Sequence, residues 1–115
     1  MQLNKENFIK IIKKRPIVIW GARMTGIGFT RFSKKHNLEI ISFVDSDPSL
    51  QGLKIENYTI GNPESIGSLK FQYDNLIILI AVALKEDEIT NSIKGMGLNE
   101  TDYINYGDCV DVFYT

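Results

Sequence analysis

The sequence has few of the residues that crosslink a chain or bind a metal ion. Its 115 residues include one cysteine, one histidine and three prolines. A single cysteine cannot form an internal disulfide, so Cys109 is expected to be a free thiol in a reducing compartment and the core must stabilise the fold. His36 has no second histidine to share a metal ion with, and no metal site is predicted.

Neither sign of charge is in excess, because 13 Lys and Arg residues stand against 14 Asp and Glu residues, for a net charge of −1. Without a surplus of cations to neutralise phosphates, we expect no nucleic-acid partner and no binding to an anionic membrane. The longest wholly apolar run, residues 76–84, is far shorter than the roughly 20 residues of a membrane helix. The N-terminus lacks the basic and apolar regions of a secretory signal, so a cytoplasmic protein is expected.

Motifs of nucleophilic catalysis are also missing. The sequence contains no GxSxG and no GxxxxGK[ST] pattern, and Cys109 has no partners for a triad. No catalytic residue is predicted, and the chain is not expected to be an enzyme by itself.

The length suits a single domain over residues 1–115. Its end, residues 108–115, is unusual because apolar residues continue to the terminus, where chains are normally polar. The tail indicates either a domain cut from a longer protein or a segment that docks on its own domain or on a partner.

Short apolar runs alternate with amphipathic segments along the chain. Strands are predicted at residues 17–20, 39–44, 58–60, 76–82 and 103–106. The main helices are predicted from Asn4 or Asn7 to the cations at 13–15, at 24–35 with an exit at Asn37, and at 85–96. Such alternation favours an α/β fold, a three-layer Rossmann-like doubly wound sheet of about five mainly parallel strands in the order 3-2-1-4-5.

Residues 17–26, IVIWGARMTG, carry the one motif with a chemical meaning. They form a predicted strand, a tight turn and a helix start, which is the setting in which a glycine-rich turn binds phosphate. Gly21 permits the sharp turn, Gly26 allows the helix to pack closely on the sheet, and the helix start favours an anion. The residues of this turn predicted to bind a nucleotide are Gly21, Ala22, Arg23, Thr25 and Gly26.

Arg23 replaces the middle glycine of the GxGxxG pattern, and its side chain obstructs the approach of a dinucleotide pyrophosphate. Two roles stay open for it: holding a phosphate through paired N–H donors, or pointing into solvent. Asp45, at the end of the second predicted strand, stands where an acid accepts hydrogen bonds from ribose hydroxyls. The alternative is that Asp45 and Asp47 only build the turn before Pro48.

Three other features are interpreted structurally. The acids at 86–88 would repel a phosphate, so any anion is expected at the Gly21 turn. Trp20 is expected in the core rather than stacked on a base. His36 is expected to be a solvated helix cap.

The turn at Gly21, Ala22 and Gly26, with ISFVDSDP at residues 41–48, resembles the N-terminal domain of the sialic-acid O-acetyltransferase-like sugar acyltransferases and related domains of glycan-biosynthesis proteins. The resemblance spans roughly residues 16–106. It implies that the domain holds the nucleotide part of a UDP-sugar, with the turn on phosphate and Asp45 as the matching acid, while the chemistry lies in a following β-helix. The chain departs from that family at residues 23–24 and 83–84.

The sequence therefore predicts a nucleotide-binding module for a small-molecule nucleotide, a UDP-sugar in preference to NAD, in a carbohydrate or polysaccharide biosynthesis or modification system. A homodimer or a covalently attached catalytic domain would complete it. One alternative is a degenerate Rossmann-like interaction or dimerisation domain without a ligand. An NAD-dependent oxidoreductase is the least favoured.

Overall fold

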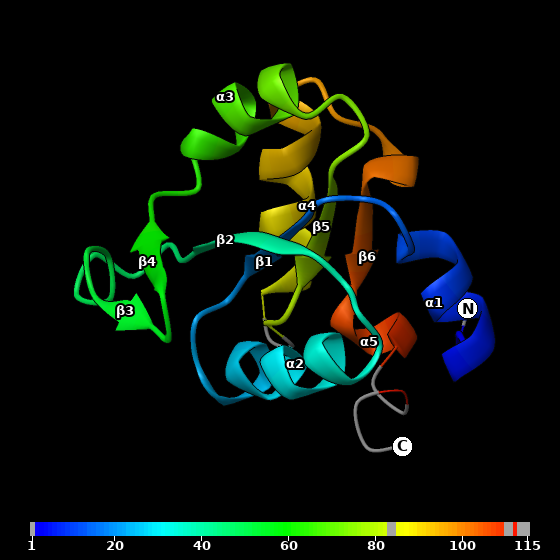
Figure 1. Cartoon of the computed structure of the whole chain (residues 1–115). Helices are drawn as coiled ribbons and strands as arrows, with labels where there is room; N and C mark the ends of the chain where they lie inside the picture. Colours follow the sequence, from blue (N-terminus) through cyan, green and yellow to red (C-terminus); the bar gives the residue numbers. More distant parts are fainter. Residues whose placement is uncertain (1, 83–84, 110–111, 113–115) are drawn as a thin grey trace.

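The central sheet has six strands in the order β3-β4-β2-β1-β5-β6 in the computed structural model, which describes residues 2–82, 85–109 and 112. The strands are β1 (Ile17–Trp20), β2 (Ile40–Val44), β3 (Lys54–Ile55), β4 (Tyr58–Gly61), β5 (Ile77–Ile80) and β6 (Tyr103–Asn105). The helices are α1 (Lys5–Ile12), α2 (Met24–Lys35), α3 (Ser65–Gln72), α4 (Glu86–Gly95) and α5 (Tyr106–Cys109), with a 3₁₀ turn η1 (Glu100–Asp102). Figure 1 shows β1, β2, β5 and β6 through the middle of the molecule and β3 and β4 at one side.

The predicted α/β class is confirmed. The five predicted strands lie in the predicted order, and their neighbours pair in parallel. The sequence does not predict β3, which adds an antiparallel edge to β4 through the pairs Lys54 with Thr59 and Ile55 with Tyr58. A two-residue strand is too short to show a period of its own.

The two faces of the sheet are covered by separate apolar clusters. Ile17 and Ile19 of β1 pack with residues of α1 and α2, whereas Val18 and Trp20 pack with residues of α3 and α4. Successive side chains of a strand point to opposite faces. A strand buried on both faces therefore needs the unbroken apolar run that β1 has.

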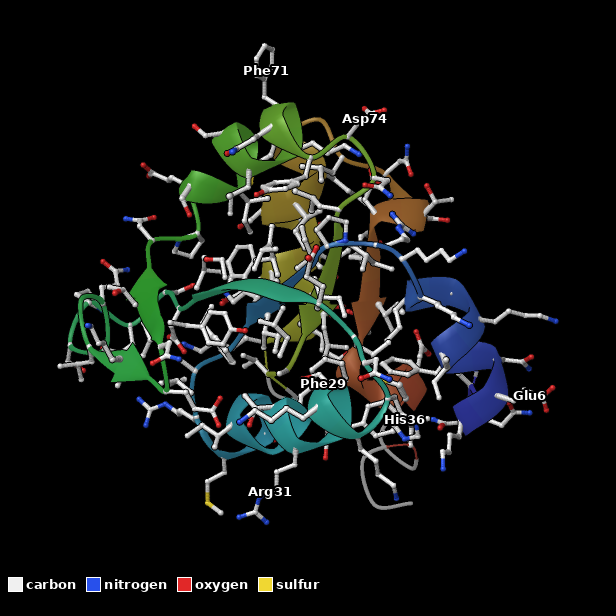
Figure 2. The ribbon with its side chains drawn as sticks, in the orientation of Figure 1. Glu6, Phe29, Arg31, His36, Phe71 and Asp74 are labelled. Atoms are coloured by element: carbon white, nitrogen blue, oxygen red, sulfur yellow. The ribbon has the colours of Figure 1, made fainter. Side chains whose placement is uncertain are left out.

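Aromatic rings join α1 to α2 below the first face. The Phe8 ring lies edge-on to Phe29 and Phe32, with centroids 6.0 and 5.8 Å away. Figure 2 shows Phe29 on the side of α2 that faces the sheet and Arg31 on the side that faces away. This packing fixes α2, and with it the turn at its start.

The helix ends follow the predicted signals with one difference. Asn4 caps α1 by accepting a hydrogen bond from the Asn7 N–H at 2.8 Å, and Asn37 adopts the left-handed conformation after α2 with φ of 55°. His36 is the C-cap of α2, as expected from the sequence, but it is only partly solvated. Its ring packs on Phe32 with centroids 4.4 Å apart, and its buried Nε2 has no hydrogen-bond partner within the described chain.

The end of the described chain folds back onto the domain. Val112 is 1% exposed and belongs to the cluster of α1 and α2, as does the buried Cys109. At this residue the tail docks on its own domain, while residues 110, 111 and 113–115 lie outside the described part. In the part described, no helix has the length and apolar character to cross a membrane.

Candidate functional site

A cavity of about 770 Å³ opens at the carboxyl ends of β1, β2 and β5. β1 lies between β2 and β5, so the chain leaves β1 toward one side of the sheet and later crosses to the other. Ligands of open α/β sheets bind in the crevice at this reversal of strand order. The cavity walls are the β1–α2 turn, the segment after β2, the end of β5 and one face of α4.

The predicted site residues come together here. Gly21, Arg23, Thr25 and Asp45 line the cavity, while Ala22 lies between Gly21 and Arg23 and Gly26 lies in the first turn of α2. The local sequence motif and Asp45, distant in the chain, therefore meet at one place.

The turn depends on both of its glycines. Gly21 has φ of 124°, a conformation that residues with a Cβ rarely adopt, and its N–H donates to the Val44 carbonyl at 2.8 Å. A Cβ added to Gly26 would lie 1.9 Å from the carbonyl oxygen of Gly21. The start of α2 thus presses directly on the turn, as the motif predicts.

The N-terminus of α2 is open to an anion. Arg23 precedes the helix in an extended conformation and makes no side-chain cap, and the first turn contains no acid. The first N–H groups of a helix lack partners within the helix, and the helix dipole places partial positive charge there. Together with the adjacent cavity, this end can receive a phosphate or carboxylate.

Asp45 ties the turn to the end of β2. It is 8% exposed, and its Oδ2 accepts from the Ala22 N–H at 2.8 Å while its Oδ1 accepts from the Asp47 N–H at 2.9 Å. These bonds give Asp45 a role in building the turn. Each carboxylate oxygen has acceptor capacity for a further hydrogen bond, and Asp45 lines the cavity, so it can also accept from a hydroxyl donor.

Arg23 is exposed but paired. Its Nη2 lies 2.7 Å from Oδ2 of Asp47, and the two side chains are 71% and 33% exposed. Asp47 Oδ1 accepts from the Ser49 N–H and Oγ–H at 2.9 and 2.8 Å. Hydrogen bonds from Ser49, assisted by the Arg23 charge, hold the pKa of the Asp47 carboxyl below its ordinary value.

The wall formed by α4 was missed in the sequence. Glu88 and Ser92 line the cavity from this helix, together with its N-cap Lys85 and with Val82 after β5. The available signal was topological: β5 neighbours β1, so residues that follow it in the chain belong at the same edge of the sheet. The predicted acids stand in the first turn of α4, and Glu88 among them lines the cavity. The departure noted at residues 83–84 lies outside the described residues.

Trp20 occupies the core, as expected, at the floor of the cavity. It is 3% exposed, and its indole Nε1 donates to Ser46 Oγ at 3.3 Å. Within the described ranges, no group of three or more His, Cys, Asp or Glu residues could hold a metal ion.

A family model and several solved structures match this chain. The model of the family described as C2185-like, N-terminal, matches residues 13–104. UDP-D-quinovosamine 4-dehydrogenase from Vibrio fischeri has a TM-score of 0.66 at 18% identity, over 80% of this chain and 77% of that chain. Comparison with curated protein sequences gives no match.

A repressor has the same fold over about half its length. RSP, a Rex-family repressor, has a TM-score of 0.63 at 15% identity, over 85% of this chain and 54% of that chain. RSP in complex with β-NAD⁺ and operator DNA gives 0.62 at 17% identity, over 87% and 54%. These likenesses confirm the Rossmann-like fold, which nucleotide-binding and NAD-binding proteins share.

The exclusion of a nucleic-acid partner was wrong. A protein with this fold is solved in complex with operator DNA. The net charge of −1 is a sum over the chain, and such a sum does not describe a local surface or a second domain.

Proposed function

We propose that this chain, which belongs to the C2185-like N-terminal family, is a nucleotide-binding module. The observation that carries the proposal is the cavity at the crevice of the sheet, where the Gly21 turn and the uncapped start of α2 meet Asp45. These are the parts from which a Rossmann-like fold makes a nucleotide site. No catalytic role is assigned to a residue of this chain.

The phosphates would lie at the start of α2. Uncapped N–H groups, the absence of acid in the first turn and the nearby Arg23 all favour negative charge there. The ribose would lie toward Asp45, whose oxygens retain acceptor capacity. The wall formed by the end of β5 and by α4 combines apolar Val82 and Ile89 with polar side chains of α4, which suits a base or sugar.

Among nucleotides, the proposal favours the UDP part of a sugar nucleotide in carbohydrate biosynthesis over NAD. Arg23 stands where a dinucleotide site needs a glycine for close approach of the pyrophosphate. One structural neighbour is, by its name, a dehydrogenase of a UDP-sugar, and another binds NADH. Both ligands therefore belong in the test. A catalytic half, in the same polypeptide or in a partner, would act on the bound ligand.

The test measures binding of UDP, UDP-glucose and NAD⁺ by calorimetry and by the free energy of unfolding. A ligand at 100 times its Kd should add about 2.7 kcal/mol to the stability of the folded chain. The expected order of affinity is UDP-glucose and UDP above NAD⁺. If none of the three adds stability or heat, the domain is not a module for these nucleotides.

A charge-matched pair of variants locates the site. Thr25→Glu places an acid in the first turn of α2 at the cavity, and should weaken UDP binding about tenfold or more by repelling phosphate. Ser68→Glu adds the same charge at an exposed position of α3, outside the cavity lining, and should leave UDP affinity unchanged. Equal effects of the two variants would contradict a phosphate site at α2.

A further inference from the structure

We infer that Asp47 is an internal competitor for Arg23: it holds the guanidinium until a ligand phosphate takes its place, and so sets the affinity and the anion selectivity of the cavity. This inference rests on the proposed nucleotide site and states how a charged side chain beside that site regulates its affinity. The ligands that should overcome the competitor are nucleoside diphosphates, whose phosphate oxygens can accept two parallel hydrogen bonds from arginine.

The two partners of the pair are held very differently. The Asp47 carboxylate is fixed through Oδ1 by the backbone and hydroxyl of Ser49, and only Oδ2 faces Arg23. Arg23 is 71% exposed and makes one ion pair within the described chain. In an exchange, the arginine is therefore the group that moves, and the aspartate stays at the cavity wall.

The pair is strong enough to compete but weak enough to break. Ion pairs between exposed side chains contribute little net free energy, because water solvates both charges in the open state. A phosphate carries more charge than a carboxylate and can offer two acceptors to the guanidinium, whereas Asp47 offers only Oδ2 because its Oδ1 accepts from Ser49. A ligand with two phosphates can displace Asp47, whereas an anion with one carboxylate gains almost nothing from the exchange.

The decisive variant is Asp47→Asn. The amide oxygen of asparagine can still accept from the Ser49 N–H, so the turn is kept, while an NH₂ group replaces the oxygen that holds Arg23. UDP should then bind about two- to fivefold more tightly, the range that an exposed ion pair supports. Acetate, which gains nothing by displacing one carboxylate with another, should also bind more tightly once Arg23 is released, so that the preference of the cavity for UDP over acetate narrows.

The matched control uses another exposed pair. Lys34 Nζ and Glu56 Oε1 are 2.8 Å apart, and neither residue lines the cavity. Glu56→Gln changes the net charge by the same amount as Asp47→Asn, and should alter UDP affinity by less than the error of the titration. This comparison separates the release of Arg23 from a general loss of negative charge.

A double-variant cycle tests the mechanism itself. Arg23→Gln should weaken UDP binding, and Asp47→Asn should give no further gain in that background. If Asp47→Asn improves binding equally with and without Arg23, or no more than Glu56→Gln does, the competitor role is wrong while the nucleotide site stands. UDP binding by Asp47→Asn with none by the unaltered chain would support the inference in its strongest form. Absence of binding in both would overturn the inference and the proposed function together.

Discussion

Each end of the sheet holds an arginine, and the two are used in opposite ways. At the amino end, Arg15 donates to the carbonyl oxygens of Asn75, Leu76 and Thr101 at 2.7, 3.0 and 3.1 Å. Its side chain is 22% exposed and lies 3.8 Å from the carboxylate of Asp102. This guanidinium is committed to joining the segments before β1, β5 and β6.

At the carboxyl end, Arg23 is 71% exposed and has one ion-pair partner among the residues that the structure describes. Beside the cavity, Arg23 stands before α2 and makes no side-chain cap to its first turn. At the amino end, by contrast, Asp102 accepts hydrogen bonds from Lys70 Nζ and from the Asn99 N–H. Residue type alone therefore does not mark a site. Polar groups satisfied within the chain hold the fold together, and those with spare capacity beside a cavity are available to a ligand.

The largest effect is expected from breaking the turn at the carboxyl end. Gly26→Ala should destabilise the fold by at least about 3 kcal/mol, because the new Cβ would overlap the backbone oxygen of Gly21. Urea denaturation measures the loss.

Gly28→Ala is the control in the same helix, since nothing lies within 4 Å of its added Cβ. It should stabilise the chain by about 0.5–1 kcal/mol, the gain of alanine over glycine in a helix. Similar losses in both variants would show that α2 does not press on the turn.

The second prediction compares the arginines directly. Arg15→Met should cost about 2 kcal/mol of unfolding free energy, because three carbonyl oxygens lose their donor and the 7% exposed Asp102 keeps only Lys70 of its two cationic neighbours. Arg23→Met should change stability by no more than about 0.5 kcal/mol, as an exposed pair does. The same denaturation experiment checks both. Equal costs would erase the distinction between the two ends.

The third prediction concerns Asp45, which belongs to the fold and to the proposed site. Asp45→Asn should destabilise the chain by about 1 kcal/mol, because the amide accepts from only one of the two backbone N–H groups that the carboxylate now satisfies. UDP affinity should fall as well. A stability unchanged from the parent chain would show that the two backbone bonds contribute nothing net, and would leave ribose binding as the reason for an acid at this position.

Much of the carboxyl end could be predicted from sequence because its information is local. Gly21 and Gly26 stand at the spacing of one turn, and the apolar runs gave the strands and their parallel order. Asp45 was found because the rule for its position counts along the chain. In each case a short-range pattern carries a steric requirement that the structure then meets.

The amino end could not be predicted in the same way. Arg15 looks in sequence like a cation closing the first helix, and nothing local links it to Leu76 or Thr101, which only the parallel crossovers bring beside it. The wall of α4 at Lys85 was missed for the same reason. The prediction that the protein has no nucleic-acid partner failed because net charge is summed over the whole chain and does not say where on the surface the charges lie.

The smallest effect is expected at Cys109, which tests whether the carboxyl end is open everywhere. This residue follows β6 at the same end of the sheet but is fully buried, with its Sγ–H donating to the Asn105 carbonyl at 3.4 Å. Burial, with the charges of Asp108 and Glu86, raises the pKa of the thiol to about 12. Because only the thiolate reacts readily, maleimide labelling of the native chain at pH 8 should be negligible, and should become complete after unfolding in urea. The thiol keeps its proton in the folded state to higher pH than in the unfolded state, so stability should fall as pH rises from about 9 toward 12. Rapid labelling at pH 8 would mean that the carboxyl edge of the sheet is also open to solvent beyond β6. The difference between the two ends would then apply to the whole edge, and not only to the crevice at β1, β2 and β5.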